Sequence, residues 1–173
     1  PSHTYSNLDL LAYYLKLIFL RARNSRYLKK TIDELSKDTE IIVNEFPLPR
    51  VLLKNAGIYY NTTSKRRMSK NIMLYSTIPG KALKPLSKTY LRNFAKNAVN
   101  SGGKDRISFS LGLIGTGILK REGTYQKMGE FKEDLDFVKS LGVKRVAIYS
   151  IDSIMAKGRE AERWIRLIKE YQR

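Results

Sequence analysis

The chain has 173 residues, the size of one ordinary domain, and its 42% of hydrophobic residues is too large a share for a disordered polymer. Its 33 Lys and Arg outnumber 16 Asp and Glu, and the net charge of +17 exceeds the charge of about 8 that suffices for solubility in a small domain, which indicates an anionic partner. With no cysteine and a single histidine, His3, the sequence excludes disulfides, a thiol nucleophile and Cys-ligated zinc; it predicts no metal site and identifies no cofactor.

The first 38 residues are predicted to be helical. In "LDLLAYYLKLIFL", residues 8–20, apolar residues recur at steps of three and four, and a second helix is predicted over residues 27–37. The apolar run has thirteen residues and includes Asp9 and Lys16, whereas a membrane span needs about 20 apolar residues, so we expect a buried helix and no transmembrane segment. No signal-type cleavage site follows it, and the lack of cysteine fits a reducing interior, so we expect a cytoplasmic protein.

From residue 39 onward, predicted strands and helices alternate. Short β-branched and apolar runs predict strands within residues 40–49, 72–80, 106–119 and 144–154. Amphipathic spacing predicts helices within residues 50–57, 84–103, 130–142 and 159–173, and the basic stretch 58–71 is expected to be a loop or hairpin. This order predicts a single α/β domain with a mostly parallel sheet of about four strands. Either an open sandwich or part of a (β/α) barrel satisfies it.

Polar side chains follow the predicted strands where each apolar run ends. They are Asn44 and Glu45 after the first strand, Tyr75 after the second, and Tyr149 and Asp152 after the fourth. Because ligands of parallel α/β proteins collect at the carboxyl ends of strands, these residues are candidates for a site. Glu45 and Asp152 are the candidate catalytic carboxylates, and Asn44, Tyr75 and Tyr149 are candidates for positioning a substrate.

The dipeptide Asn44-Glu45 at a strand end resembles the acid/base motif of retaining glycoside hydrolases with a (β/α)8 barrel. The resemblance covers residues 40 to 155 and implies that Glu45 closes a fourth strand. The strand three units later then ends near Asp152, where that family commonly has Glu. It would also imply double displacement by two carboxyls about 5 Å apart, with the remaining strands supplied by a larger protein.

Each of these residues also has a purely structural interpretation. Glu45 could pair with Arg50 or cap the following helix, and Asp152 could be an N-cap or turn residue. Tyr75 and Tyr149 could be core aromatic residues whose hydroxyls reach the surface. The sequence leaves these alternatives open.

The middle of the chain carries most of its positive charge. From Phe46 to Lys104, 59 residues include twelve Lys and Arg but no Asp or Glu, where the average composition would give about five acids. Four cations recur at steps of four and would share one helix side: Lys84, Lys88, Arg92 and Lys96. The preceding basic stretch adds Lys65, Arg66, Arg67 and Lys70, and bases could stack on Tyr59, Tyr60 and Tyr90.

We therefore expect a protein that binds or processes a phosphate-rich polyanion, with nucleic acid as the leading candidate, through a basic face formed by residues 50–104. The sequence has no helix-turn-helix, zinc-finger or RNP motif, so sequence-specific readout is not indicated. The alternative is a barrel-type hydrolase, with a glycosidase as one candidate, that uses Glu45 and Asp152. A third interpretation is an interaction domain whose basic face docks on an acidic protein or an anionic membrane surface.

Overall fold

The computed structural model describes residues 25–57, 59, 67–78, 80–115 and 123–172, and for residues 25 and 80–84 it describes the backbone only. The predicted helix over residues 8–20 and most of the basic stretch between residues 58 and 66 lie outside this description. Among the helices within it, none has the length and apolar character needed to cross a membrane.

Four strands form one parallel sheet. They are β1 (Ile41–Glu45), β2 (Met68–Leu74), β3 (Ile107–Leu111) and β4 (Val146–Ile148), and they pair in the order β1-β2-β3-β4. The register sets Asn44 beside Asn71, Asn71 beside Ser108, and Ser110 beside Ala147. The predicted α/β class with a parallel sheet flanked by helices is thus confirmed.

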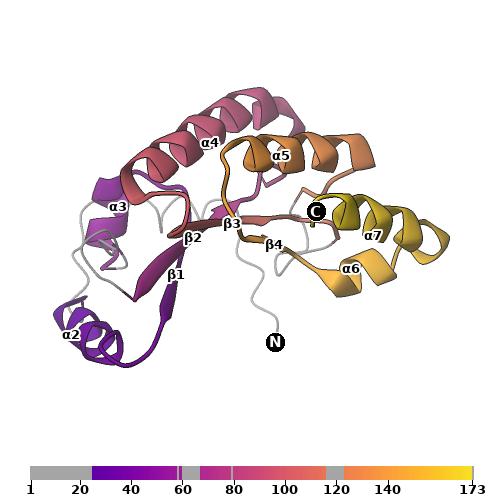
Figure 1. Ribbon diagram of the computed structural model, residues 1–173. Coiled ribbons are helices and arrows are strands. Elements are labelled where there is room, and N and C mark those ends of the chain that lie inside the picture. The colour runs from indigo at the N-terminus through magenta and orange to yellow at the C-terminus, as the bar shows by residue number, and fades with distance from the viewer. Residues whose placement is uncertain (1–24, 58, 60–66, 79, 116–122, 173) are drawn as a thin grey trace, which may run out of the picture.

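Helices connect the strands and cover one side of the sheet. Figure 1 shows α3 (Arg50–Asn55), α4 (Gly80–Gly102) and α5 (Met128–Ser140) on this side, with α7 (Ala161–Glu170) next to α5. The other helices are α2 (Ser25–Leu35), which lies beyond β1, and the short α6 (Ile151–Met155), which follows β4. A 3-10 turn, Gly158–Glu160, leads into α7.

The order of the strands explains why these helices share a side. A parallel strand-helix-strand unit is right-handed in nearly all proteins, so strands that are added one after another in one direction carry their helices on the same face. A doubly wound sheet would reverse direction and place helices on both faces. The sheet is therefore wound in the same sense as a (β/α) barrel wall.

The covered face of the sheet is apolar. Ile72 and Leu74 from β2 and Phe109 and Leu111 from β3 are at most 4% exposed and belong to the hydrophobic core. The helices contribute further members of this core: Leu91 and Ala95 from α4, Phe131, Leu135 and Val138 from α5, and Trp164 and Leu167 from α7. Phe131 links α5 to α7, because its ring lies 5.5 Å from that of Trp164.

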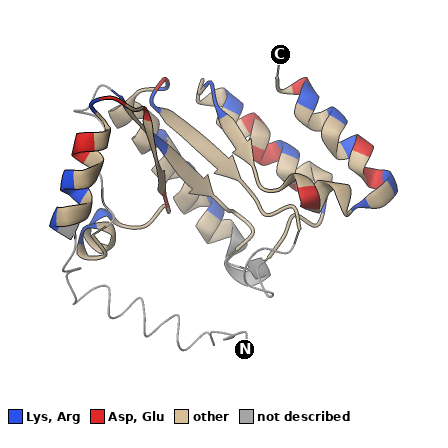
Figure 2. Cartoon of the chain, turned by 90° about the horizontal axis from the view of Figure 1, so that it is seen from below, with Lys and Arg blue, Asp and Glu red and all other residues tan. Residues whose placement is uncertain are grey.

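The opposite face is polar. Since side chains alternate along a strand, Ser69 and Asn71 of β2 and Ser108 and Ser110 of β3 point away from the apolar core, and all four are buried. The side-chain amide of Asn71 donates to Asn44 Oδ1 at 2.8 Å and to Ser110 Oγ at 2.6 Å, which ties three strands together. In Figure 2 the strands lie in front of α4 and α5 on this face.

Three element boundaries differ from the sequence prediction. Strand β2 begins at Met68, within the stretch predicted to be a loop, because Ser69 and Asn71 are polar residues of a two-faced strand. Strand β3 ends at Leu111, before the glycines of the predicted run. Strand β4 ends at Ile148, and Ile151 begins α6, with Ser150 as its N-cap.

Glycine ends three of the helices, as the sequence predicted. Gly57, Gly103 and Gly142 follow α3, α4 and α5 with φ of 72°, 82° and 69°, a region that other residues adopt only at a cost. The amide of Gly103 donates to the Val99 carbonyl at 2.8 Å, which satisfies a group at the end of α4.

Neighbouring residues on β3 test the two-faced sheet. Phe109→Ala removes a fully buried ring and should lower the free energy of unfolding by about 3–5 kcal/mol. Ser108→Ala, on the polar face, removes a hydroxyl that donates to Asn71 Oδ1 and should cost about 1 kcal/mol. Urea denaturation of both variants measures these costs, and equal losses would contradict the assignment of the faces.

Candidate polyanion-binding site

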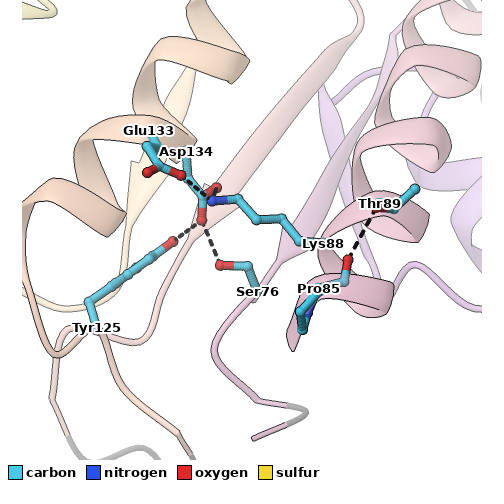
Figure 3. A network of polar contacts seen from close by, with 7 residues as sticks. All are labelled: Ser76, Pro85, Lys88, Thr89, Tyr125, Glu133 and Asp134. Atoms are coloured by element: carbon cyan, nitrogen blue, oxygen red, sulfur yellow. Dashed lines mark hydrogen bonds and ion pairs between the residues drawn. The ribbon is translucent and has the colours of Figure 1, made fainter. Parts of the chain in front are cut away.

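The predicted basic row on α4 lies partly within the contact between α4 and α5. Lys88 Nζ lies 2.5 Å from a carboxylate oxygen of Glu133 and 3.6 Å from one of Asp134, both on α5 (Figure 3). The guanidinium of Arg92 lies 5.1 Å from the centre of the Phe137 ring on the same helix. Lys96 is exposed, whereas the side chain of Lys84 is outside the described part. Lys88 and Arg92 therefore hold two helices together rather than facing solvent.

Asp134 is the centre of a buried network at this contact. Its Oδ2 accepts hydrogen bonds from Ser76 Oγ at 2.5 Å and from the Tyr125 hydroxyl at 2.9 Å (Figure 3). Burial and the nearby Asp134 carboxylate raise the pKa of Tyr125 well above its usual range, so the phenol keeps its proton and donates the hydrogen bond to Asp134. The network joins the segment after β2 to both helices and gives Asp134 a structural role.

Glu45 forms an ion pair on the helix-covered side of the sheet. Its Oε2 lies 2.7 Å from Lys70 Nζ, and the two side chains are only 5% and 13% exposed. The register accounts for the pairing, because Val43 lies beside Lys70 and Glu45 beside Ile72, so Glu45 shares a face with Lys70. The partner of Glu45 is thus Lys70, where the structural alternative from the sequence had named Arg50.

Lys70 and two cations of α3 gather around Tyr59. The side-chain charges of Arg50, Lys54 and Lys70 lie 5.0, 5.8 and 5.6 Å from the centre of its ring. Glu45 neutralises Lys70, whereas Arg50 and Lys54 are exposed on α3. Arg67 donates to the Lys37 carbonyl at 2.9 Å, and Lys65 and Arg66 are outside the described residues.

The other candidate residues lie at three different strands. Asn44 is on the polar face at the end of β1, and Asp152 is exposed in the first turn of α6, where Ser150 and not Asp152 is the N-cap. The rings of Tyr75 and Tyr149 lie 6.5 Å apart. Glu45 is the last residue of edge strand β1, and Asp152 follows edge strand β4. Three spacings of about 4.8 Å separate these two strands along the sheet.

A cationic groove lies between the start of α5 and α7. It consists of two adjoining hollows of about 210 and 390 Å³ that share Met128 and Arg163. Its lining includes five cations and two carboxylates: Lys127, Lys132, Lys157, Arg163 and Arg166, with Glu160 and Glu170. We call this feature the α5–α7 groove.

The cations of the α5–α7 groove differ in their contacts and in their exposure to solvent. Lys132 forms an ion pair with Asp136 at 2.8 Å, and this contact lowers the pKa of the Asp136 carboxyl. Lys157 Nζ lies 4.8 Å from the centre of the buried Trp164 ring. Arg163 and Arg166 are exposed one turn apart on α7. The positive end of the α5 dipole adds to the potential of these cations.

Sequence reasoning missed this groove because its cations are mixed with acids along the chain. Residues 157–170 alternate Lys and Arg with Glu, so this segment does not stand out as the acid-free middle does. Figure 2 shows blue segments on α5 and α7 as well as on the helices at the other end of the sheet. The amphipathic spacing around Trp164 and Leu167 was the available signal, because it puts Arg163 and Arg166 on the outer side of α7.

Comparisons of the chain with protein-family models, with curated proteins and with solved structures find no match. Among the described residues, no group of three or more His, Cys, Asp or Glu side chains is placed to hold a metal ion. The candidate site therefore rests on its own geometry and charge.

The ion pair between Glu45 and Lys70 can be tested by a double-mutant cycle. Glu45→Gln leaves a largely buried ammonium without its carboxylate and should lower the free energy of unfolding by about 3 kcal/mol. Adding Lys70→Met removes that charge and should restore part of the loss. Urea denaturation of the wild type, both single variants and the double variant measures the coupling. Additive losses would show that the pair contributes no coupling energy.

Three surface ion pairs predict a loss of stability in acid. Hydrogen bonds from Lys88, Lys132 and Lys144 lower the pKa values of Glu133, Asp136 and Asp105 below their unfolded values. Because the folded pKa values are the lower ones, this stability is present above the unfolded values and is lost as the pH falls below about 4.5. Urea denaturation between pH 6 and pH 3 should show the decline.

Lys88→Met should make that decline shallower, because Glu133 then loses the main cause of its lowered pKa. Lys29→Met, on exposed α2, is the matched control and should leave the profile unchanged. An identical pH profile in the Lys88 variant and the wild type would contradict this assignment.

Proposed function

We propose that the protein binds a phosphate-rich polyanion, with single-stranded nucleic acid as the leading class, in the α5–α7 groove. The observation that carries this proposal is the excess of cations over carboxylates in the lining of the groove. A net charge of +17 adds long-range attraction for any polyanion and raises its association rate.

The dimensions of the groove favour a single strand over a duplex. Two hollows of about 210 and 390 Å³ suit a narrow, flexible chain, whereas a duplex is a thick rod that is read by elements protruding into its grooves. Trp164 is 3% exposed and covered by Lys157, so its ring is not available as a stacking platform. Binding would therefore be electrostatic and insensitive to base sequence.

The acid-free middle of the chain has a secondary role in this proposal. Of its cations, Lys70 and Lys88 are neutralised by carboxylates, and Arg92 packs on an aromatic ring. Arg50 and Lys54, exposed beside Tyr59, form a second place where a polyanion could contact the protein.

Three double variants with the same loss of charge separate these places. Arg163→Gln with Arg166→Gln should reduce the magnitude of the negative slope of log K against log salt by about 1.4 for a single-stranded oligonucleotide, because each lost phosphate contact removes about 0.7. Arg50→Gln with Lys54→Gln should lower it by less. Lys29→Gln with Lys30→Gln, on α2 at the other end of the molecule, is the control and should leave it unchanged.

Fluorescence anisotropy between 50 and 200 mM salt gives all three slopes. If all three variants bind alike, the attraction is a property of the net charge alone and the groove is not the site. If the wild type shows no binding at 50 mM salt, the proposed function itself is wrong.

A barrel-type hydrolase is the second candidate, and the sequential parallel order of the strands favours it. In this candidate Asn44, exposed at the end of β1, would contact the substrate, and Glu45 would have to leave Lys70 to act as acid/base. This candidate predicts that the wild type hydrolyses aryl glycosides and that Asp152→Asn abolishes the activity. No hydrolysis by the wild type would exclude the candidate.

A further inference from the structure

Three arginines occupy equivalent positions at the amino end of the sheet. Arg67, Arg106 and Arg145 immediately precede β2, β3 and β4. Their carbonyls accept hydrogen bonds from the neighbouring strands at 2.9, 2.8 and 3.4 Å, which fixes their backbones at the sheet edge. Because side chains alternate, all three lie on the polar face, in line with Ser69 and Ser108 and opposite the apolar core.

These residues surround a hollow of about 560 Å³. Its size is within the range of about 300–1,000 Å³ that is usual for ligand pockets. Arg145 Nη1 lies 3.4 Å from Glu40 Oε1, although Glu40 precedes β1 and Arg145 precedes β4, the two edge strands. The contact therefore reaches across the polar face at its amino end.

Ser69 places a buried hydroxyl in the lining of the hollow. The residue is 4% exposed, and its Oγ has no hydrogen-bond partner within the described part of the chain. A buried hydroxyl without a partner is unfavourable, and such groups are rare in folded proteins. An oxyanion in the hollow would accept this hydrogen bond.

The charges of the hollow favour a ligand that carries both an oxyanion and hydroxyl groups. Two lining carboxylates already have cation partners, Glu40 with Arg145 and Asp105 with Lys144 at 2.8 Å. Arg67 uses one N–H for the Lys37 carbonyl and has others to donate. Guanidinium groups match phosphate oxygens, whereas the carboxylates would repel a bare anion but accept hydrogen bonds from hydroxyls.

We propose that the amino end of the polar face, lined by Arg67, Ser69 and Arg106, binds a small phosphorylated polyol of the pentose-phosphate class. The phosphate lies against the two guanidinium groups and accepts from Ser69, and hydroxyls of the ligand donate to Glu40 and Asp38. The site is separate from the α5–α7 groove and does not depend on the function proposed for it.

Ribose 5-phosphate is the probe, with ribose and inorganic phosphate as the comparison ligands. In a calorimetric and ¹⁵N NMR titration, ribose 5-phosphate should bind and shift the backbone amides of residues 67–70 and 105–107. Inorganic phosphate should bind more weakly, and ribose should not bind. Equal affinity for phosphate and ribose 5-phosphate would overturn the role given to the carboxylates, and unmoved amides would overturn the site.

Two variants distinguish a ligand-binding role from a structural one. Ser69→Ala and Arg67→Gln should each lower the affinity for ribose 5-phosphate about tenfold, because each removes a hydrogen bond to a charged group. Ser69→Ala should leave the melting temperature unchanged or raise it, since the lost hydroxyl has no partner in the described structure. Lys29→Gln with Lys30→Gln, on exposed α2, is the control and should keep full affinity. Unchanged affinity in both hollow variants would overturn the proposal.

Discussion

Sequential parallel pairing of the four strands is the constraint on which the rest of the structure depends. Since each strand-helix-strand unit is right-handed, adding every strand on the same side of the last one places α3, α4 and α5 on one face of the sheet. That face is apolar, with Phe109 at its centre, and the other is a band of serine and asparagine. The same winding makes α4 and α5 direct neighbours.

The packing of neighbouring helices and strands determines which cations are available to a binding partner. The contact between α4 and α5 brings Lys88 close to Glu133 and Asp134. The pairing of β1 with β2 brings Lys70 close to Glu45. These cations stabilise the fold and are not available to bind a ligand. In the α5–α7 groove, by contrast, Arg163 and Arg166 lie on the outer side of α7, and Trp164 on its inner side is buried in the core. A basic sequence thus becomes a basic site only where the packing leaves more cations than carboxylates on one surface.

Much of the fold could be predicted from the sequence because it depends on local patterns. The β-branched run at residues 41–43, the glycines after α3, α4 and α5, and the amphipathic spacing of α5 and α7 each indicate an element directly. The start of β2 could not be predicted, because Ser69 and Asn71 look like loop residues until the strand is known to have a buried polar face.

The candidate site was harder to predict because it depends on contacts between distant residues. The spacing of Lys88 and Arg92 predicts that they share one side of a helix, and they do. Nothing in the spacing reveals that α5 covers this side. Likewise, the acid that neutralises Lys70 is 25 residues away, at a strand end where it looked like a working carboxylate. Charge counted along the chain therefore locates the excess of cations but not the surface that they form.

Lysine acetylation followed by mass spectrometry, with and without a single-stranded oligonucleotide, tests this account most directly. In the free protein, Lys70 and Lys88 should react slowly because carboxylates hold them, and Lys127 should react fast. Bound oligonucleotide should slow the acetylation of Lys127 and Lys157 and leave Lys88 unchanged. Fast reaction of Lys88 in the free protein, together with its protection by the oligonucleotide while Lys127 and Lys157 stay reactive, would contradict the account.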